Sequence, residues 1–395
     1  MIQIINLKNA INCDAILVIY YLYISYTHDV YMCNLIKSIN LINRGISMKA
    51  CVLHKKHDLR YEEVEDPIIK NPHEVKVKIL TAGICGSDQH YYHEGGIGSS
   101  IVVREPMIIG HEGCGIVQEV GESVTSVKVG DFVVLRPARP CFECHFCKQG
   151  QYTYCEHMQH IGSAALYPHT QGLFADYVVV HETQCFDCQG IDPSIAAFSE
   201  PLGVAYNGVR SLGEIIGKNI LVMGAGPIGI LCASVAKVLG AKTVSIIDIR
   251  NNTLEVAQQM GVDYVCNSKK DKGLIAKWSE HKGFFDATVE ATGNGYACID
   301  AMRLTKPMGV ISQVGMFGSN MAPADLGQFM TKGLDWKAVF RFYDEFEPCI
   351  NALKQGFIDP TPMISASFDA QNCQEALEAA LSPDTCKVQI VLNKV

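Results

Sequence analysis

Two patterns of hydrophobic and polar positions divide the chain. Between Met48 and about Gly203, short apolar runs such as VKVKIL at 75–80 and GDFVVL at 130–135 are broken by Gly, Pro and His. This pattern is typical of short β-strands joined by loops. From about Val204, apolar strand runs alternate with helical periodicity, which favours a parallel sheet covered by helices. We therefore predict an α/β protein in which a β-rich domain precedes a doubly wound domain.

The second pattern is clearest from residue 219 onward. NILVMG at 219–224 predicts a buried strand. Apolar residues then recur at helical spacing until Gly240, namely Ile228, Leu231, Val235 and Val238. Further strands are predicted at TVSIID (243–248), FDATVEA (285–291), GVISQVG (309–315) and, near the C-terminus, VQIVLN (388–393). The doubly wound domain is therefore expected to span 204–341, with the β-rich domain at 48–203 completed by 342–395.

Residues 1–47 match neither pattern. Their apolar run at 16–24 lacks the basic flank and cleavage site of a signal peptide. It is also shorter than the roughly 20 apolar residues that span a bilayer. A second methionine, Met48, opens a run with the alternation of a first strand. We expect 1–47 to be an extension outside the fold, such as a start codon placed too early would produce. A poor signal peptide is the alternative.

Composition and charge narrow the class of protein. A chain of 395 residues suggests about two domains, and 48% apolar residues suffice for large cores. The net charge of -8 and the lack of a basic run argue against a nucleic-acid partner. The 17 cysteines are odd in number and belong to a long chain, which argues against a secreted disulfide scaffold. We expect a cytoplasmic protein with no membrane partner, in which some thiols hold metal.

A glycine-rich turn follows the strand predicted at 219–224. Gly224, Gly226 and Gly229 form the G-x-G-x-x-G pattern, with Ile228 opening the helix behind it. Glycines are needed where a tight turn lets the backbone approach a pyrophosphate and lets a helix pack closely on its strand. The turn therefore predicts a dinucleotide site, with a plain strand-helix connection as the alternative.

An acidic residue in the expected place strengthens the dinucleotide prediction. Asp248 ends the next predicted strand, where a carboxylate can accept hydrogen bonds from ribose hydroxyls. The same carboxylate repels a 2′-phosphate, which favours NAD over NADP. Arg250, two residues later, keeps NADP use open, and Val314 is a further expected cofactor contact.

Four closely spaced cysteines predict a structural zinc site. The spacing is C-x2-C-x2-C-x7-C, formed by Cys141, Cys144, Cys147 and Cys155. Four thiolates brought together by short turns match the closed tetrahedral coordination of structural Zn²⁺. An iron-sulfur cluster is a rival, since similar cysteine runs hold such clusters.

A second group of residues predicts a catalytic metal. Cys85 lies in AGICGSDQHYYHEGG, His111 and Glu112 in GHEGCG, and Glu200 in FSEPLG. One thiolate, one imidazole and one carboxylate leave a fourth coordination position open, as a catalytic zinc requires. A Lewis acid beside a hydride acceptor is the combination that alcohol oxidation needs. Singly, each residue also has an ordinary structural explanation.

Together these motifs resemble the zinc-containing medium-chain dehydrogenase family. The resemblance covers Met48 to Val395 and includes GICGSDQHYYHEG, GHEGCGIV, the cysteine lobe, AFSEPL at 197–202 and FRF at 340–342. It implies a GroES-like catalytic domain and a Rossmann domain. The segment GSAALYPHTQGLF at 162–174 is most similar to members that act on L-idonate, and members acting on sorbitol and xylitol are nearer than the ethanol enzymes.

The resemblance also implies residue roles. Cys85, His111 and Glu200 would surround the catalytic zinc, with Glu112 as an alternative or transient ligand. The remaining expected site residues are the polar pair beside the metal and two pocket residues, namely Ser87, His90, Tyr91 and Arg341. Ser87 and His90 would pass the hydroxyl proton outward. For a sugar acid, the Arg341 guanidinium can pair with the substrate carboxylate.

We therefore expect two zinc ions per chain and NAD, with NADP as an alternative. The expected reaction moves hydride between the C5 hydroxyl of L-idonate and the nicotinamide, yielding 5-keto-gluconate. A dehydrogenase of neutral polyols such as sorbitol, xylitol or galactitol is the alternative. A zinc protein that binds nucleotide without catalysis is a hypothesis of another class. A homo-oligomer, dimer or tetramer, is also expected.

Overall fold

The structure is a computed structural model that describes residues 47–317 and 322–394. The extension predicted at 1–47 lies outside these residues except for Ser47. Met48–Val395 forms one compact unit. Among the described residues, no helix is long and apolar enough to cross a membrane.

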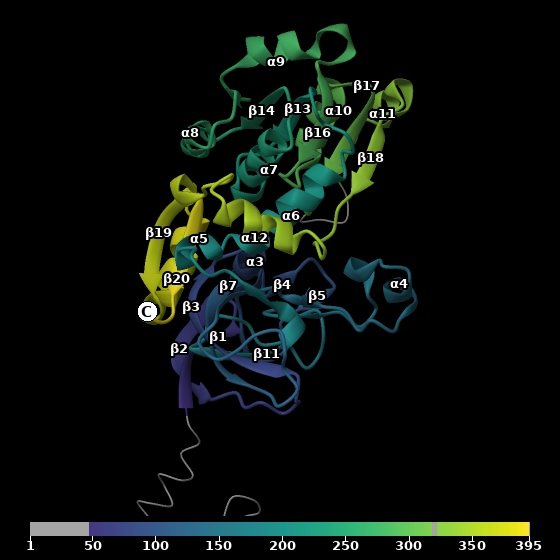
Figure 1. Ribbon diagram of the computed structural model, residues 1–395. Coiled ribbons are helices and arrows are strands. Elements are labelled where there is room, and N and C mark those ends of the chain that lie inside the picture. The colour runs from purple at the N-terminus through teal and green to yellow at the C-terminus, as the bar shows by residue number, and fades with distance from the viewer. Residues whose placement is uncertain (1–46, 318–321, 395) are drawn as a thin grey trace, which may run out of the picture. The chain divides into compact units, whose positions relative to one another are not determined.

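The β-rich domain is built on a seven-stranded sheet (Figure 1). Its strands run in the order β12-β8-β7-β3-β20-β19, and β11 also pairs with β3. Their bounds are β3 (Glu74–Gly83), β7 (Glu112–Val120), β8 (Phe132–Leu135), β11 (Tyr177–His181), β12 (Cys185–Asp187), β19 (Ile364–Asp369) and β20 (Lys387–Val391). The strands predicted at 75–80, 130–135 and 388–393 are confirmed by β3, β8 and β20.

The C-terminal strand is part of this sheet. β20 runs antiparallel to β3, with Gln389 opposite Gly83 and Val391 opposite Thr81. β3 alternates between its two faces: Val75, Val77 and Ile79 are fully buried, while the lysines between them are partly exposed. Residues more than 300 positions apart in the chain therefore share one sheet.

Small sheets and short helices surround the main sheet. The small strands are β1 (Ser47–Lys55), β2 (Asp58–Glu65), β6 (Met107–Ile108), β4 (Gly96–Ile97), β5 (Ile101–Val102), β9 (Ala138–Arg139) and β10 (Gln159–His160). The helices are α3 (Gly86–Glu94), α4 (His145–Lys148), α5 (Pro193–Ala196), α12 (Phe346–Lys354) and α13 (Cys373–Leu381). Single 3₁₀ turns occur at Tyr152–Tyr154, Glu182–Gln184, Glu280–Lys282, Thr361–Met363 and Ala370–Asn372.

The second sheet has six parallel strands in the order β15-β14-β13-β16-β17-β18. Their bounds are β13 (Asn219–Met223), β14 (Thr243–Asp248), β15 (Tyr264–Asn267), β16 (Phe285–Glu290), β17 (Thr305–Gln313) and β18 (Asp335–Ala338). From β13 the order steps outward through β14 and β15 on one side and through β16, β17 and β18 on the other. This is the strand order of dinucleotide-binding doubly wound domains, whose ligands bind where the order reverses.

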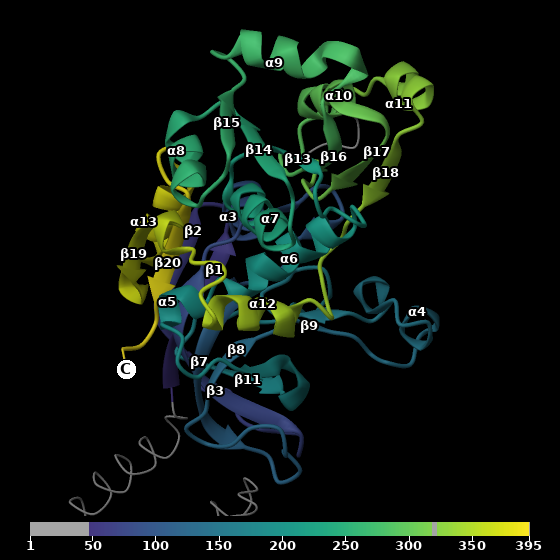
Figure 2. The ribbon, with the colours of Figure 1, turned by 45° about the horizontal axis from the view of Figure 1, so that its top comes forward.

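Alternate residues of β13 face two separate cores. Ile220 and Val222 pack in the core that contains α7, whereas Leu221 and Met223 pack with residues of α9 and α10. Helices therefore cover both faces of the sheet (Figures 1 and 2). The helices of this domain are α7 (Pro227–Val238), α8 (Asn251–Gln259), α9 (Lys272–Ser279), α10 (Gly295–Leu304) and α11 (Leu326–Lys332). α7 confirms the helix predicted after the glycine turn. As predicted, it ends before Gly240, which has φ +90°.

One helix passes through the boundary predicted between residues 203 and 204. α6 (Ser199–Arg210) runs from the β-rich domain into the nucleotide domain without interruption. Its Ala205 and Val209 lie in the same core as Val222 of β13 and Leu80 of β3. The two sheets thus share a hydrophobic core, and α6 is common to both domains.

The glycine turn supplies a prediction on stability. A Cβ at Gly229 would lie 1.9 Å from the Gly224 carbonyl oxygen, whereas a Cβ at Gly226 would meet nothing within 4 Å. We expect Gly229→Ala to lower the free energy of unfolding by about 1–3 kcal/mol, because the turn must shift. Gly226→Ala, the matched control, should change it by less than about 0.5 kcal/mol. Chemical denaturation of both variants measures this, and equal stability of the two would contradict the packing described.

Candidate functional site

The four-cysteine lobe brings its sulfur atoms together. Cys141, Cys144, Cys147 and Cys155 each offer a ligand atom within 4.8 Å of the others. The lobe carries α4 and extends from the β-rich domain in Figure 1. Its core is small, consisting of Ala138, Met158 and the two buried cysteines of the four. A unit with so little apolar core needs a further crosslink, which a metal provides.

Backbone N–H groups in the lobe point at the sulfurs. The amides of Glu143 and Cys144 donate to Cys141 Sγ at 3.5 and 3.3 Å and lower the pKa of that thiol. The amides of Cys147 and Glu156 lower the pKa of Cys144 to about 6. Thiolates are the form that binds zinc. The lobe therefore fits a structural zinc ion held by all four cysteines.

The second donor group gathers from residues at the starts of two elements. Cys85 precedes α3, His111 precedes β7, and Glu112 is the first residue of β7. Their ligand atoms lie within 4.8 Å of one another. The thiol, imidazole and carboxylate predicted for a catalytic metal thus include Glu112.

Buried Asp88 organises this donor group. Its carboxylate accepts from the backbone amides of Cys85 at 2.9 Å and Gly110 at 3.0 Å, and it lies 3.7 Å from His111 Nδ1. The two loops that carry Cys85 and His111 are therefore fixed to the same side chain. Burial raises the pKa of Asp88, and the charge of His111 and the two amides oppose that rise.

The donor chemistry fits zinc with an open position. His111 Nδ1 is buried and has no hydrogen-bond partner among the described residues. Burial, together with Glu112 and Asp88, raises the pKa of the Cys85 thiol to about 12 although Lys387 opposes the rise; a bound Zn²⁺ would favour its thiolate. One sulfur, one nitrogen and one carboxylate are three of the ligands that catalytic zinc takes.

Glu200 lies beside the donors but is not one of the set that meets within 4.8 Å. It lies in the first turn of α6 and is buried, and burial together with Glu112 and Cys85 raises its pKa to about 8, which His111 opposes. The sequence predicts Glu200 as the third ligand, with Glu112 as the alternative. The geometry favours Glu112 in the set and leaves Glu200 next to it.

The two residues predicted to carry the proton lie on α3. Ser87 is partly buried and its hydroxyl lowers the pKa of the Cys85 thiol by a hydrogen bond. His90 is exposed, and its Nδ1 lies 3.0 Å from Glu94 Oε1. Residues three apart on a helix are neighbours. The pair thus runs from the donor group toward solvent.

Tyr91 and Arg341 also lie near the donors. The hydroxyl of buried Tyr91 accepts from the Ala164 amide at 3.2 Å, which ties α3 to the segment at 162–174. Burial lowers the pKa of Arg341, and Tyr91 and Glu200 oppose that shift. A guanidinium that is desolvated beside these groups can bind an anionic part of a ligand.

Two residues that the sequence did not single out complete the site. The ring centre of His160, on β10, lies 5.4 Å from that of His111. Burial lowers the pKa of His160 well below the usual range, and the charges of Arg341 and His111 lower it further. Lys387 on β20 is buried, forms an ion pair with Glu112 and donates to the Ile84 carbonyl at 2.9 Å. Neither carries a local sequence signal, because each acquires its neighbours through the fold.

The glycine turn has the geometry of a dinucleotide site. Gly224 has φ +96°, and its amide donates to the Ile247 carbonyl at 2.7 Å. Gly226 is the N-cap of α7, and a Cβ there would meet nothing within 4 Å; the amides at a helix N-terminus are a favourable site for phosphate. Ile228, in the first turn of α7, packs at the edge of the shared core.

Asp248 closes the turn from the next strand. Its carboxylate accepts from the Ala225 amide at 2.6 Å and from the amides of Ile249 and Arg250 at 2.6 and 2.9 Å. The Arg250 side chain lies 3.7 Å from the same carboxylate. The predicted ribose acid is therefore held at the glycine turn, with a cation beside it.

One helix links the metal donors to the nucleotide turn. α6 carries Glu200 in its first turn, beside the donors, and packs along α7, where Cys232 Sγ lies 3.8 Å from the Ala205 carbonyl. Farther along α6, a Cβ at Gly208 would lie 2.7 Å from a methyl of Val314, the predicted cofactor contact after β17. The position of the donors is thus coupled to that of the nucleotide turn.

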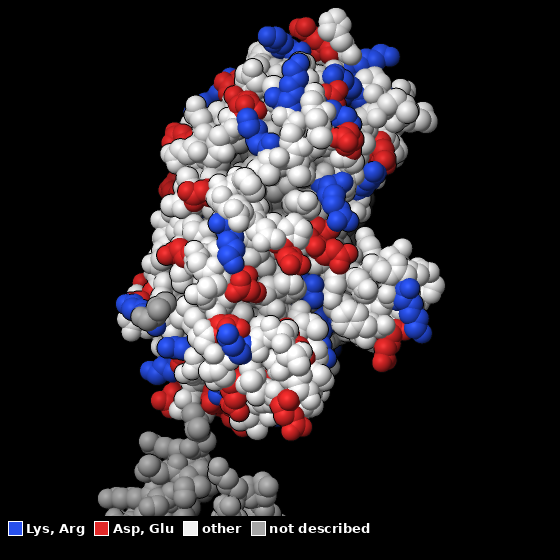
Figure 3. Space-filling view, in the orientation of Figure 1, with Lys and Arg blue, Asp and Glu red and all other residues white. Residues whose placement is uncertain are grey.

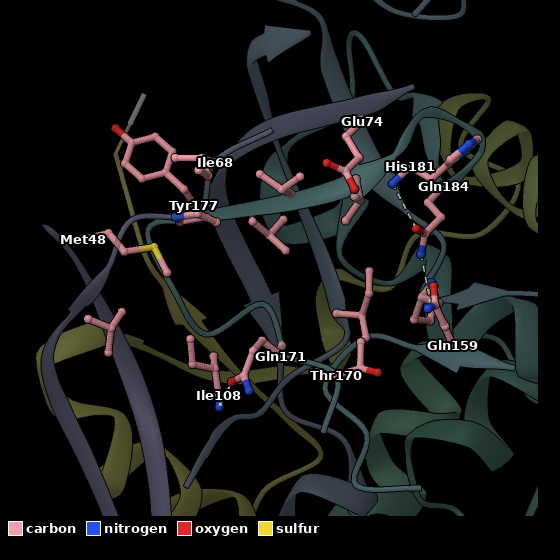
Figure 4. Close-up of a pocket in the computed structure, with 18 of the residues that line it drawn as sticks. Met48, Ile68, Glu74, Ile108, Gln159, Thr170, Gln171, Tyr177, His181 and Gln184 are labelled. Carbon is pink, nitrogen blue, oxygen red and sulfur yellow. Dashed lines mark hydrogen bonds between the residues drawn. The ribbon is translucent and has the colours of Figure 1, made fainter. Parts of the chain in front are cut away.

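A cavity of about 580 Å³ lies elsewhere in the β-rich domain (Figure 4). Met48, Ile108, Gln171 and Tyr177 line it, and Figure 4 shows Gln184 and His181 at its other end. None of the predicted site residues lines it. The volume of a cavity therefore does not identify the catalytic site of this protein, whereas the groups of metal-binding side chains do.

Comparison with known families agrees with this geometry. Residues 71–190 match the alcohol dehydrogenase GroES-like domain, and residues 227–355 match the zinc-binding dehydrogenase domain. Together with a relative of 33% identity described below, these matches settle the family. The chain belongs to the zinc-binding medium-chain alcohol dehydrogenases, and the predicted combination of GroES-like and Rossmann domains is confirmed.

Curated relatives act on sugar acids and polyols. L-idonate 5-dehydrogenase (NAD(P)(+)) of Escherichia coli (strain K12) is 33% identical over 348 residues, covering 88% of this chain and 99% of the relative. Sorbitol dehydrogenase of Bacillus subtilis (strain 168) is 31% identical, covering 88% and 98%. The protein is thus an oxidoreductase of the zinc-dependent polyol and sugar-acid group.

Solved structures give the same assignment. The crystal structure of L-idonate 5-dehydrogenase from Escherichia coli matches with a TM-score of 0.83 and 32% identity, covering 88% of this chain and 99% of that one. An alcohol dehydrogenase from E. coli CFT073 complexed with cofactor NADH matches with a TM-score of 0.79 and 29% identity, covering 88% and 100%.

The two donor groups predict the zinc content of the protein. We expect dialysed protein to contain two zinc ions per chain, as measured by elemental mass spectrometry. Cys85→Ser and Cys144→Ser should each retain about one, because each removes a thiolate from a different site. Cys114→Ser, which alters a buried thiol outside both groups, should retain two. A single zinc per chain in the unaltered protein would contradict the two-site interpretation.

The two carboxylates predict different effects on that zinc. Glu112→Ala should weaken zinc binding at the Cys85 site by about 10–100-fold in competition with a chelator. Glu200→Ala should weaken it less, since Glu200 lies outside the set of three donors. The reverse order would restore Glu200 as the third ligand.

Proposed function

We propose that the chain oxidises a secondary hydroxyl of a sugar acid, namely the C5 hydroxyl of L-idonate, with NAD as hydride acceptor. The observation that carries the proposal is the desolvated Arg341 guanidinium beside Tyr91 and Glu200, next to the metal donors. A guanidinium pairs with a carboxylate through two parallel hydrogen bonds. The identity of 33% to the E. coli L-idonate 5-dehydrogenase supports the same substrate.

The chain supplies a defined setting for this oxidation. Zinc with an open position acts as a Lewis acid toward an alcohol oxygen, and a nicotinamide dinucleotide accepts the hydride. Cys85, His111 and Glu112 would hold the zinc. The turn at Gly224 and Gly226 would hold the pyrophosphate. Substrate C5 loses its C–H as hydride and the hydroxyl loses a proton, which yields 5-keto-gluconate, NADH and H⁺; the reverse reduction uses the same groups.

The proton leaves along α3 in this proposal. Ser87 is partly buried next to Cys85 and accepts the hydroxyl proton while donating its own toward His90. The exposed His90 imidazole, paired with Glu94, passes the proton to solvent. An imidazole can both accept and donate a proton, which suits this task.

His160 supplies an acceptor beside Arg341. Its Nδ1 donates to the Ile161 carbonyl at 3.0 Å, since a carbonyl oxygen only accepts. In the neutral ring that burial favours, Nε2 then carries a lone pair. Arg341 would bind the substrate carboxylate, and His160 would accept from a substrate hydroxyl.

NAD is the proposed cofactor, with NADP as the alternative. The Asp248 carboxylate at the glycine turn repels a 2′-phosphate. Arg250 beside it offsets part of that repulsion. A solved structure from Sinorhizobium meliloti 1021 bound to NADP has a TM-score of 0.79 and 25% identity, covering 88% of this chain and 99% of that one, which supports keeping NADP in the assay.

A neutral polyol is the second candidate substrate. Sorbitol dehydrogenase of Bacillus subtilis is 31% identical to this chain, and Tyr91 and His160 would serve a polyol hydroxyl as well as a sugar acid. A polyol would leave the Arg341 charge unpaired, which is why a sugar acid ranks first.

The proposal includes a cytoplasmic homo-oligomer that acts on a small molecule. A reducing compartment keeps zinc-binding thiols available. β18 is the last strand of its sheet, and the neighbouring Met308, Leu326 and Met330 are more than 60% exposed. Such an edge suits pairing with a second copy.

On the face in Figure 3, basic and acidic side chains are interspersed rather than gathered by sign.

Substrate preference tests the proposal. With both NAD and NADP offered, kcat/KM for L-idonate should exceed that for sorbitol and for L-threonine by about tenfold or more, since one charged hydrogen-bond pair contributes about 1.5–3 kcal/mol. Brisk turnover of sorbitol beside negligible turnover of L-idonate would replace the sugar acid with the polyol.

Arg341→Gln tests whether Arg341 binds the carboxylate of the substrate, because sorbitol has no carboxylate to lose. It should raise KM for L-idonate by about tenfold or more and change KM for sorbitol by less than about threefold. Arg139→Gln is the matched control, because Arg139 lines the separate cavity of Figure 4. Equal effects of Arg341→Gln on both substrates would remove Arg341 as the carboxylate partner.

A further inference from the structure

The segment that carries Arg341 has a backbone conformation that needs support. Arg341 lies between β18 and α12 and has φ +59°, in the left-handed region that favours glycine. A non-glycine residue keeps such a conformation only when its neighbours hold it there. The position of the guanidinium therefore depends on what contacts residues 340–345.

Two of these contacts come from α6 and α12. Asn207 Nδ2 donates to the Arg341 carbonyl at 2.7 Å. Phe342 is buried against Gly203, where a Cβ would lie 2.8 Å from its ring, and it stacks on Phe346 with centroids 5.5 Å apart. These contacts fix the backbone on the side of the shared core.

The third contact is Tyr343, which packs on buried Arg136. The Arg136 guanidinium lies 3.7 Å from the centre of the Tyr343 ring, and its nitrogens donate to the Tyr343 hydroxyl at 2.9 Å and to the Tyr343 carbonyl at 3.3 Å. Arg136 is held in turn by the Thr183 carbonyl at 3.1 Å and by the Phe186 ring. Both the side chain and the backbone of Tyr343 are thus bound.

Tyr343 also contacts the four-cysteine lobe. Its ring centre lies 4.7 Å from that of Tyr152 and 6.4 Å from that of Phe142. Tyr152 lies in the chain between Cys147 and Cys155 and packs on the core of the lobe, and Phe142 follows Cys141. The placement of both rings therefore depends on the turns that the four cysteines close.

We propose that Tyr343 is a positioning residue through which the four-cysteine lobe sets the placement of Arg341 and hence the affinity for substrate. The lobe does this without touching substrate: Tyr152 supports Tyr343, Tyr343 and Arg136 fix the backbone, and Arg341 lies two residues away. The role of Arg341 as carboxylate partner is taken from the proposed function above. The structural zinc site thereby contributes to substrate recognition.

Four variants of the zinc-loaded enzyme test the connection. Tyr343→Leu should raise KM for L-idonate by about tenfold, and Tyr152→Leu by about threefold, with kcat within a factor of two. Tyr343→Phe keeps the ring and should restore most of the affinity. Tyr154→Leu alters a half-exposed ring of the same lobe that faces Phe146 instead, and it should leave KM unchanged. Equal KM in Tyr343→Leu and Tyr154→Leu would overturn the proposal.

A double variant shows whether Tyr343 acts through Arg341. In an Arg341→Gln background, Tyr343→Leu should add less than a twofold change in KM for L-idonate, because the group it positions is gone. A further tenfold rise in that background would mean that Tyr343 acts by another route, which would overturn the proposal.

Hydrogen-deuterium exchange gives a readout apart from activity. Tyr152→Leu should speed exchange of the amides of residues 340–345, while Tyr154→Leu should not, and unchanged exchange in Tyr152→Leu would overturn the link from the lobe. If Arg341→Gln leaves KM for L-idonate unchanged, the carboxylate role in the proposed function fails. Amide exchange in Tyr152→Leu then still shows whether the lobe holds residues 340–345. A failure of the proposed function is thereby distinguished from a failure of the link between the lobe and this segment.

Discussion

The burial of acidic and thiol groups around one point is the constraint on which the site depends. Asp88, Glu112 and Glu200 are buried and Cys85 is half-buried, all close to His111. Buried charges are costly unless they are paired or bind a metal. Lys387 pairs with Glu112, and the family's zinc supplies the remaining positive charge. The main sheet, the start of α3 and the start of α6 must therefore converge as they do.

The same convergence explains why two domains act as one enzyme. The last strand, β20, brings Lys387 across the sheet to Glu112, and α6 runs from Glu200 to the nucleotide domain. A shared core joins both sheets along α6. Hydride transfer needs substrate and cofactor in fixed relative positions, since reacting atoms must lie within about 3–3.5 Å. A continuous helix between the metal donors and the nucleotide turn meets that need.

Local patterns in the sequence predicted much of this. A short apolar run predicted β3, helical spacing predicted α7, and cysteine spacing predicted the lobe, because each depends on residues close in the chain. The boundary at 203 was less accurate, since α6 runs through it. Lys387 and His160 were missed, because their neighbours Glu112 and His111 are distant in sequence. The choice between Glu112 and Glu200 likewise depends on which carboxylate the folded sheet brings to Cys85.

Anomalous X-ray scattering at the zinc absorption edge tests the central claim most directly. Two peaks per chain are expected in crystals of the protein. One should lie among the four cysteines of the lobe, and the other between Cys85 Sγ, His111 and Glu112. A strong peak in the lobe with no density between Cys85 and His111 in zinc-replete crystals would contradict the account.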